Sequence, residues 1–379
     1  MKVVIFFLFF LSILAIDAAE YDLKKTLIDQ LPPNQWIQIH EQKKNDSVRF
    51  RRQNHGGCCF DTKRGRLILF GSNTHSKDWK NCLYFFDPVK REWTRSYSPD
   101  PKETYKVENG IPVAGAQADH PWATHTFGTV VYDSRRDEVV VACYPGHMRP
   151  DKWGKAVKHP WPPIEKHHTW VYRMAEKKWV PLPCDPVHFF PNSAAYDPDT
   201  SAVYGHKPGR IYGLSGTPRK WQLLAKGATV PGWGHDNCVY DAGQKKVVIF
   251  GSNKNTNHVA VFDPEKKQIT QPKTAGVRPP ADQHNPMAYA ANVGKTVVLA
   301  DRTKRKDNAE KDTTETWLYD LAKDQWTRIP TADLPFACGM NFNMAYDPSR
   351  KILLLVTGNS RRSTTVWALR IRLEEEKSE

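Results

Sequence analysis

The sequence lacks the short motifs that mark nucleotide-dependent enzymes and serine hydrolases. It contains no P-loop, no Gly-x-Gly-x-x-Gly and no Gly-x-Ser-x-Gly, so neither nucleotide-dependent nor α/β-hydrolase chemistry has support. A recognition helix, an RNP-type motif and a zinc finger are also missing. We therefore expect no nucleic-acid partner.

Cysteine and long hydrophobic runs are both scarce. The seven cysteines include no Cys-x-x-Cys pair, and their odd number leaves at least one unpaired, so we expect mostly buried strand cysteines. One apolar run stands out, Val3–Ile16, which follows Lys2 and precedes Ala18 and Ala19. This layout predicts a signal peptide at 1–19, and the run is too short for a comfortable membrane span.

The signal peptide sets the expected compartment and domain organisation. We expect a secreted or periplasmic protein with no membrane contact after cleavage. Asp17, an unusual residue near a cleavage site, keeps an uncleaved anchor as the alternative. The remaining length suits one domain, and the expected boundaries are a leader at 20–33, the domain at 34–373 and a charged tail at 374–379.

An internal repeat indicates the fold. Five times, an aromatic or large apolar residue is followed seven positions later by Trp or another large apolar residue. The turn between them is polar, as in two short strands joined by a hairpin. The pairs are Phe86 and Trp93, Tyr172 and Trp179, Leu214 and Trp221, Phe262 and Ile269, and Tyr319 and Trp326.

A second hairpin precedes each of these pairs. Its first strand ends in an aromatic residue, usually followed by Asp, and a β-branched apolar run comes next. These aromatics are Phe60, Tyr132, Tyr196, Tyr240, Tyr289 and Tyr346. Their recurrence every 44 to 72 residues predicts an all-β fold, a six-bladed β-propeller of four-stranded antiparallel blades. Long segments at 97–123 and 145–166 keep seven blades as the alternative, although Pro, Gly and charge favour loops there.

The two ends of the repeat predict how the ring closes. The sixth unit has strands at Asn341–Tyr346, Lys351–Thr357 and Thr365–Arg372 but no fourth strand. Near the start of the chain, Asn34–His40 reads as an unpaired strand with Trp36 at the outer-strand position. We expect this strand to complete the last blade and to remove an exposed sheet edge. An unrelated leader strand is the alternative.

The outer-strand tryptophans, the Phe-Gly-Ser ends of two second strands and the seven-residue aromatic spacing resemble the kelch class of propeller. The resemblance covers nearly the whole mature chain. It is imperfect, because the kelch Gly-Gly pair is replaced by Gly71-Ser72, Gly251-Ser252 and Gly358-Asn359. Kelch propellers include both enzymes and binding scaffolds, so the resemblance implies the fold and leaves the function open.

The net charge of +14 indicates an anionic partner for an exported protein. Since nucleic acid has no support, we expect an acidic polysaccharide, uronate-bearing or sulfated, bound by a monomer. Part of the positive charge lies in hairpins such as the TKRGR turn at 62–66, which are ordinary solvated turns.

Histidine placement predicts where a site lies. All fourteen histidines fall in or beside the loops between blades or between second and third strands, and these loops share one face, called here the histidine face. Tryptophans in the same loops suit stacking on sugar rings; packing of the loops on themselves is the alternative. The substrate-binding candidates are Trp79, Trp122, Trp153, Trp233, His188, His206 and Arg149.

The catalytic candidates belong to blades two and three. Antiparallel pairing is expected to bring His125, at the start of an inner strand, close to Tyr144 and His147, and these residue types suit proton transfer. Arg210 suits a carboxylate, which it can hold with two parallel hydrogen bonds. The layout resembles that of propeller-fold polysaccharide lyases. The resemblance implies β-elimination of a uronate polymer, with His and Tyr as acid and base and Arg neutralising the uronate.

Two other functions remain open. A non-catalytic glycan- or protein-binding propeller explains the charge and the tryptophans almost equally well. A metal-dependent enzyme or copper-radical oxidase needs a metal site, for which the candidates are His55, His235 and His284, since imidazole suits Zn or Cu. Blades one and four lie opposite each other in a six-bladed ring, too far apart to share a metal. Hydrogen-bonded histidines are therefore preferred, and we expect no cofactor apart from an optional metal ion.

Overall fold

The computed structural model describes residues 27–46, 48, 55–72, 78–143, 145, 164–189, 192–228, 234–252, 257–283, 285–301, 313–337, 342–358 and 363–373. The expected signal peptide at 1–19 and charged tail at 374–379 lie outside these ranges. Among the helices in the described ranges, none is long and apolar enough to cross a membrane.

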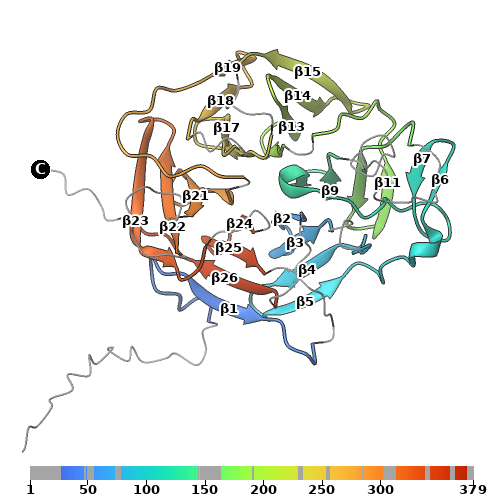
Figure 1. Ribbon diagram of the computed structural model, residues 1–379, viewed down its shortest axis with the longest axis horizontal. Coiled ribbons are helices and arrows are strands. Elements are labelled where there is room, and N and C mark those ends of the chain that lie inside the picture. Colours follow the sequence, from blue (N-terminus) through green and yellow to red (C-terminus); the bar gives the residue numbers. More distant parts are fainter. Residues whose placement is uncertain are drawn as a thin grey trace, which may run out of the picture.

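Six four-stranded antiparallel sheets surround a central axis as the blades of a propeller (Figure 1). Blades one to three consist of β2 (Gly57–Asp61), β3 (Arg66–Phe70), β4 (Tyr84–Asp87) and β5 (Glu92–Arg95); β8 (Val130–Asp133), β9 (Glu138–Val141), β10 (Trp170–Arg173) and β11 (Lys178–Pro181); and β12 (Ala194–Asp197), β13 (Ala202–Lys207), β14 (Arg210–Ser215) and β15 (Lys220–Lys226). In each blade the first strand lies at the axis and the fourth at the rim.

Blades four to six follow the same plan. Their strands are β16 (Asn237–Asp241), β17 (Lys246–Phe250), β18 (Ala260–Asp263) and β19 (Gln268–Thr270); β20 (Met287–Ala290), β21 (Lys295–Asp301), β22 (Thr314–Asp320) and β23 (Gln325–Leu334); and β24 (Asn343–Asp347), β25 (Ile352–Thr357), β26 (Thr365–Leu369) and β1 (Ile37–Glu41). The six-bladed prediction is confirmed.

The ring closes as expected. Strand β1 pairs with β26 in antiparallel register, with Ile37 opposite Ala368, so the sixth sheet has the order β1-β26-β25-β24. The inner strands contact one another in a complete cycle, from β2 through β8, β12, β16 and β20 to β24 and back to β2. The strand near the N-terminus therefore fills the outer edge of the last blade.

The seven-residue spacing corresponds to direct cross-strand pairing. All five predicted pairs stand opposite each other in the outer hairpins. In blade one the rings of Phe86 and Trp93 lie 5.0 Å apart. The carboxylate of Asp87 accepts the N–H groups of Val89 and Lys90, which fixes the turn that sets this register.

The segment at 97–123 differs from the expected plain loop. It contains a small hairpin of β6 (Lys106–Glu108) and β7 (Ile111–Val113). Asn109 and Gly110 form its turn with φ values of 52° and 78°. An Asn-Gly pair favours such a two-residue turn, so the signal was present in the sequence, but the hairpin adds no seventh blade.

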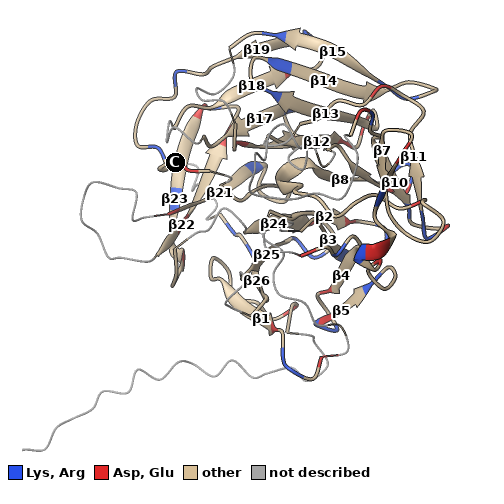
Figure 2. Ribbon diagram, turned by 45° about the vertical axis from the view of Figure 1, so that its right-hand side comes forward, with Lys and Arg blue, Asp and Glu red and all other residues tan. Residues whose placement is uncertain are grey.

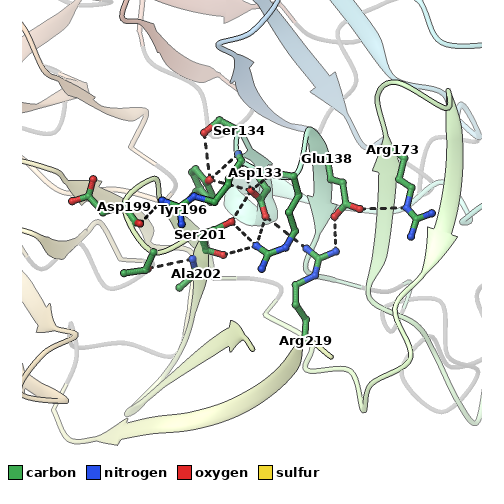
Figure 3. A network of polar contacts seen from close by, with 12 residues as sticks. Asp133, Ser134, Glu138, Arg173, Tyr196, Asp199, Ser201, Ala202 and Arg219 are labelled. Carbon is green, nitrogen blue, oxygen red and sulfur yellow. Dashed lines mark hydrogen bonds and ion pairs between the residues drawn. The ribbon is translucent and has the colours of Figure 1, made fainter. Parts of the chain in front are cut away.

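Neighbouring blades are joined on the hairpin face, which carries the turns between first and second strands. The hydroxyl of Tyr196 in blade three donates to Oδ1 of Asp133 in blade two at 3.0 Å. The same buried carboxylate accepts bonds from Ser201 and Arg136 (Figure 3). Burial alone would raise the pKa of Asp133, but hydrogen bonds, led by the backbone N–H of Arg136, lower it below its ordinary value.

The contact recurs around the ring with local changes. The hydroxyl of Tyr289 accepts the N–H of Gly243 in the preceding blade at 3.0 Å, and the hydroxyl of Tyr346 donates to Oδ1 of Asn292 at 2.9 Å. Blade five has Ala290 where most blades have Asp. Asn292 takes over the acceptor role in that blade, so the contact survives the substitution.

Outer-strand tryptophans join the same blades nearer the rim. The indole N–H of Trp179 donates to the hydroxyl of Tyr97, and that of Trp221 donates to Thr169 Oγ1. Trp36 on the closing strand bonds Thr316 of blade five in the same way. Each acceptor belongs to the preceding blade or the segment that follows its rim strand. The Trp repeat therefore marks an inter-blade contact as well as a strand position.

We predict that Tyr196→Phe lowers the free energy of unfolding by about 1 kcal/mol, because one inter-blade hydrogen bond is lost while Asp133 keeps its other donors. Chemical denaturation measures the change. The matched control is Tyr212→Phe, because the Tyr212 ring packs edge to face on Phe189 and a phenyl ring keeps this contact. Equal stability of the two variants would show that the tyrosine contact contributes nothing.

Candidate functional site

The inner strands enclose a cavity of about 330 Å³ on the propeller axis, called here the central channel. Every inner strand contributes residues to its wall. Exposed turn residues, among them Thr62, Pro198 and Ala242, also line it. The channel therefore opens on the hairpin face, opposite the histidine face.

The wall of the channel carries no formal charge. None of the described lining residues is Asp, Glu, Lys, Arg or His. Two polar side chains in the wall are hydrogen-bonded within the protein. Asn237 donates to the carbonyl of Asn285 at 2.6 Å, and Asn343 donates to the carbonyl of Gly56 at 2.9 Å. Figure 2 shows Lys and Arg spread over the blades rather than gathered at the axis.

Sequence reasoning missed this channel, although a signal for it exists. A small or medium-sized residue precedes each strand-end aromatic and lines the cavity: Cys59, Val131, Ala195, Val239, Ala288 and Ala345. Side chains of this size leave the axis unfilled.

A short 3-10 helix, η3 (Phe127–Thr129), lies at the histidine-face end of the channel. The teal turn projects toward the centre of the ring in Figure 1 and contacts β2 and β12. The approach is close, since a Cβ atom on Gly57 would lie 1.8 Å from the carbonyl oxygen of Phe127. Gly128 is also tightly enclosed, because its Cβ would lie 2.7 Å from the Cβ of Ser193. Glycine at both positions lets η3 narrow that end.

Histidines surround this helix. The ring centroids of His55 and His125 are 4.2 Å apart, and Phe127 lies 5.0 Å from His55 and 6.1 Å from His235. Burial lowers the pKa of His235, outweighing the opposing effect of the neighbouring Asp236 carboxylate. The imidazole of His235 can therefore stay neutral at neutral pH and pack against the phenyl ring of Phe127.

His206 belongs to a buried polar link between blades three and four. Its Nδ1 lies 2.9 Å from Oδ1 of Asp236, and Asn192 donates to Oδ2 of the same carboxylate at 2.8 Å. All three residues are at most 2% exposed. His206 lies in strand β13 rather than in a loop, and such burial leaves no surface for a polymer. The link can instead hold two blades in place.

Of the four predicted catalytic residues, His125 and Arg210 lie in the described part of the chain. His125 is 2% exposed, and its carbonyl oxygen lies 3.4 Å from the Cys143 sulfur. Arg210 begins β14 at the histidine face and is exposed. No contact between these two is found in the described part of the chain. Several candidates lie outside the described residues: Tyr144, His147, Arg149, Trp153, Trp233 and His284.

The predicted sugar-stacking residues Trp79 and Trp122 come from two different loops that pack against each other. Trp122 is 2% exposed, and its indole N–H donates to the carbonyl of Val113 at 2.7 Å. Its ring lies 6.4 Å from that of Trp79 and 5.8 Å from that of Tyr105. His188 is half-buried in the segment that connects blades two and three. The burial of Trp122 agrees with the alternative considered above, in which these tryptophans serve to pack the long loops.

Comparisons with known proteins show a likeness of fold. No family model matches the chain, and no curated protein matches it. A solved structure described as a novel fungal alcohol oxidase with catalytic diversity among the AA5 family, in complex with copper, is similar at 12% sequence identity and a TM-score of 0.46. The match covers 83% of this chain and 62% of the oxidase, so this chain spans less than two thirds of the oxidase's length.

This comparison corrects two expectations. The structure found to be similar is described as an alcohol oxidase and not as a lyase, so the polysaccharide-lyase function expected for His125, His147, Tyr144 and Arg210 finds no support in these comparisons and is withdrawn. The oxidase is described as a copper complex, and the expectation of no cofactor apart from an optional metal ion is withdrawn as well. The likeness is one of fold alone. The described residues include no group of three His, Cys, Asp or Glu side chains that could hold a metal ion, so we derive no copper chemistry.

We predict that His206→Ala and Asp236→Ala each lower the free energy of unfolding by about 3 kcal/mol, because either change leaves a buried polar partner without its bond. The double variant should lose less than the sum of the two. Chemical denaturation of all four proteins of this cycle gives the coupling, expected at about 1–3 kcal/mol. Additive losses would show that the two residues act independently.

Proposed function

We propose that the protein is a ligand-binding propeller that takes a neutral, largely apolar group into its central channel from the hairpin face. The observation that carries this proposal is the absence of charged residues from the described channel wall, in a chain of which 25% is charged. A charged ligand would lose its hydration there without gaining a counter-ion. A neutral ligand avoids this cost.

The size and rigidity of the channel support the same function. Its volume of about 330 Å³ falls at the lower end of the roughly 300–1,000 Å³ that small-molecule sites occupy. The tyrosine contacts between blades fix the inner strands, so little ordering is needed when a ligand enters. A compact aromatic or aliphatic group, free or on a larger partner, suits this space.

The expected acidic polysaccharide stays a prediction, and its rationale does not apply to this channel. It rested on a net charge of +14, and the Lys and Arg residues are spread over the blades (Figure 2). The kelch-type assignment and secretion also stay predictions. A glycan on the surface and a neutral ligand in the channel would be separate binding events.

We predict that neutral N-phenyl-1-naphthylamine binds and fluoresces in the channel. Val239→Phe narrows the channel, and Thr62→Trp obstructs its opening. Each variant should weaken binding of the neutral dye at least about tenfold through steric overlap. The sulfonated analogue 8-anilinonaphthalene-1-sulfonate tests the role of charge. Its signal should come from the basic surface and should not respond to the two variants.

The matched control is Val277→Phe, which introduces the same side chain at a position that is 68% exposed. Thermal melting of every variant separates lost binding from lost folding. The proposal is overturned if the neutral dye does not bind. It is also overturned if the dye binds folded Val239→Phe and Thr62→Trp as tightly as the unmodified protein.

A further inference from the structure

A second cavity, of about 370 Å³, lies on the histidine face of blade six, next to the central channel, with which it shares the lining residue Phe342. It forms where the chain crosses from blade five to blade six and where the closing strand β1 ends. We call it the blade-six groove. None of its lining residues was a candidate from the sequence.

One side of the groove is aromatic. The ring of Phe336 lies 5.8 Å from that of Phe342 and 5.4 Å from that of Trp367, in both cases edge to face. All three side chains are half-buried and pack on the core cluster between blades five and six. The indole N–H of Trp367 donates to Thr365 at 3.2 Å. With its N–H engaged in this way, the ring presents mainly apolar surface.

The other side is polar and is shaped by a β-bulge. The register of β1 against β26 shifts between Gln38 and His40. In a regular strand, side chains three positions apart point to opposite faces, and the extra residue of a bulge changes this. Gln38 and Glu41 therefore line the same groove, with Gln38 Nε2 donating to Glu41 Oε2 at 3.5 Å. Both residues are exposed.

The charge in the groove restricts its ligand. Glu41 is the one charged residue in the described lining, which includes no Lys, Arg or His. A uronate or sulfate would meet a like charge with no cation among the described lining residues. An amide next to a carboxylate supplies both donors and acceptors, which suits adjacent hydroxyl groups. The opposite aromatic wall suits the C–H face of a pyranose ring.

We propose that the blade-six groove is a saccharide subsite for a neutral pyranose ring. The ring stacks on the aromatic side chains, and two of its hydroxyls bond Gln38 and Glu41. The site adjoins the central channel at Phe342 but takes a different class of ligand. It also differs from the expected acidic polysaccharide, because its charge is of the wrong sign to hold one.

Isothermal titration of the full chain with cello-, manno-, xylo-, malto- and galacto-hexaose tests the proposal. Hexagalacturonate and its methyl ester form a matched anionic and neutral pair. At least one neutral oligosaccharide should bind, and the ester should bind more tightly than the acid. Gln38→Ala and Glu41→Ala should each weaken neutral-sugar binding about tenfold, because each removes hydrogen bonds to the sugar.

Gln222→Ala is the matched control, since Gln222 is exposed on β15, the rim strand of another blade. Trp367→Leu should abolish binding, while Trp367→Phe should retain part of it, and this conservative variant guards against a folding defect. The inference is overturned if no neutral hexaose binds or if Gln38→Ala and Glu41→Ala bind normally. The channel variant Val239→Phe should leave sugar binding intact, so this outcome is separable from that of the dye experiment.

Discussion

The hydroxyl of a strand-end tyrosine, bonded to the turn of the preceding blade, is the contact on which the arrangement of this propeller depends. Apolar packing between neighbouring blades contributes most of the cohesion, but it is non-directional and tolerates sliding. The tyrosine contact is directional. In blades two and three, Tyr196 bonds the same Asp133 carboxylate that accepts the N–H groups of its own turn, so one side chain fixes both the hairpin and its neighbour.

The same contact shapes the axis. Tyrosines that end the inner strands, such as Tyr196 and Tyr346, turn their hydroxyls to the adjacent blade, which leaves ring faces and small residues along the channel. Burial raises the pKa of Tyr346, so its hydroxyl stays protonated. At the other end η3 approaches β2 so closely that Gly57 has no room for a side chain. The neutral channel is thus a by-product of how the blades are joined.

The repeat made the fold predictable because each spacing has one geometric meaning. A residue seven positions from its partner across a polar turn, as with Phe86 and Trp93, stands directly opposite it. The strand with Trp36 was identifiable because the last unit lacked a fourth strand. The candidate site was harder to predict from the sequence. His206 was expected in a loop but lies in β13, and its burial against Asp236 depends on how two blades meet. The blade-six groove depends on a bulge between Gln38 and His40 that no spacing indicated.

Ring closure by β1 also has a consequence for biosynthesis. Ile37 is among the first residues of the domain to be made, and its partner Ala368 is among the last. Such a distant contact forms late, so β1 must remain unpaired while the rest of the chain is synthesised. A chain that stops before Thr365 has no β26 for β1 to join. The ring can therefore close only in a chain that extends from β1 through β26, because both strands of the seam are then present.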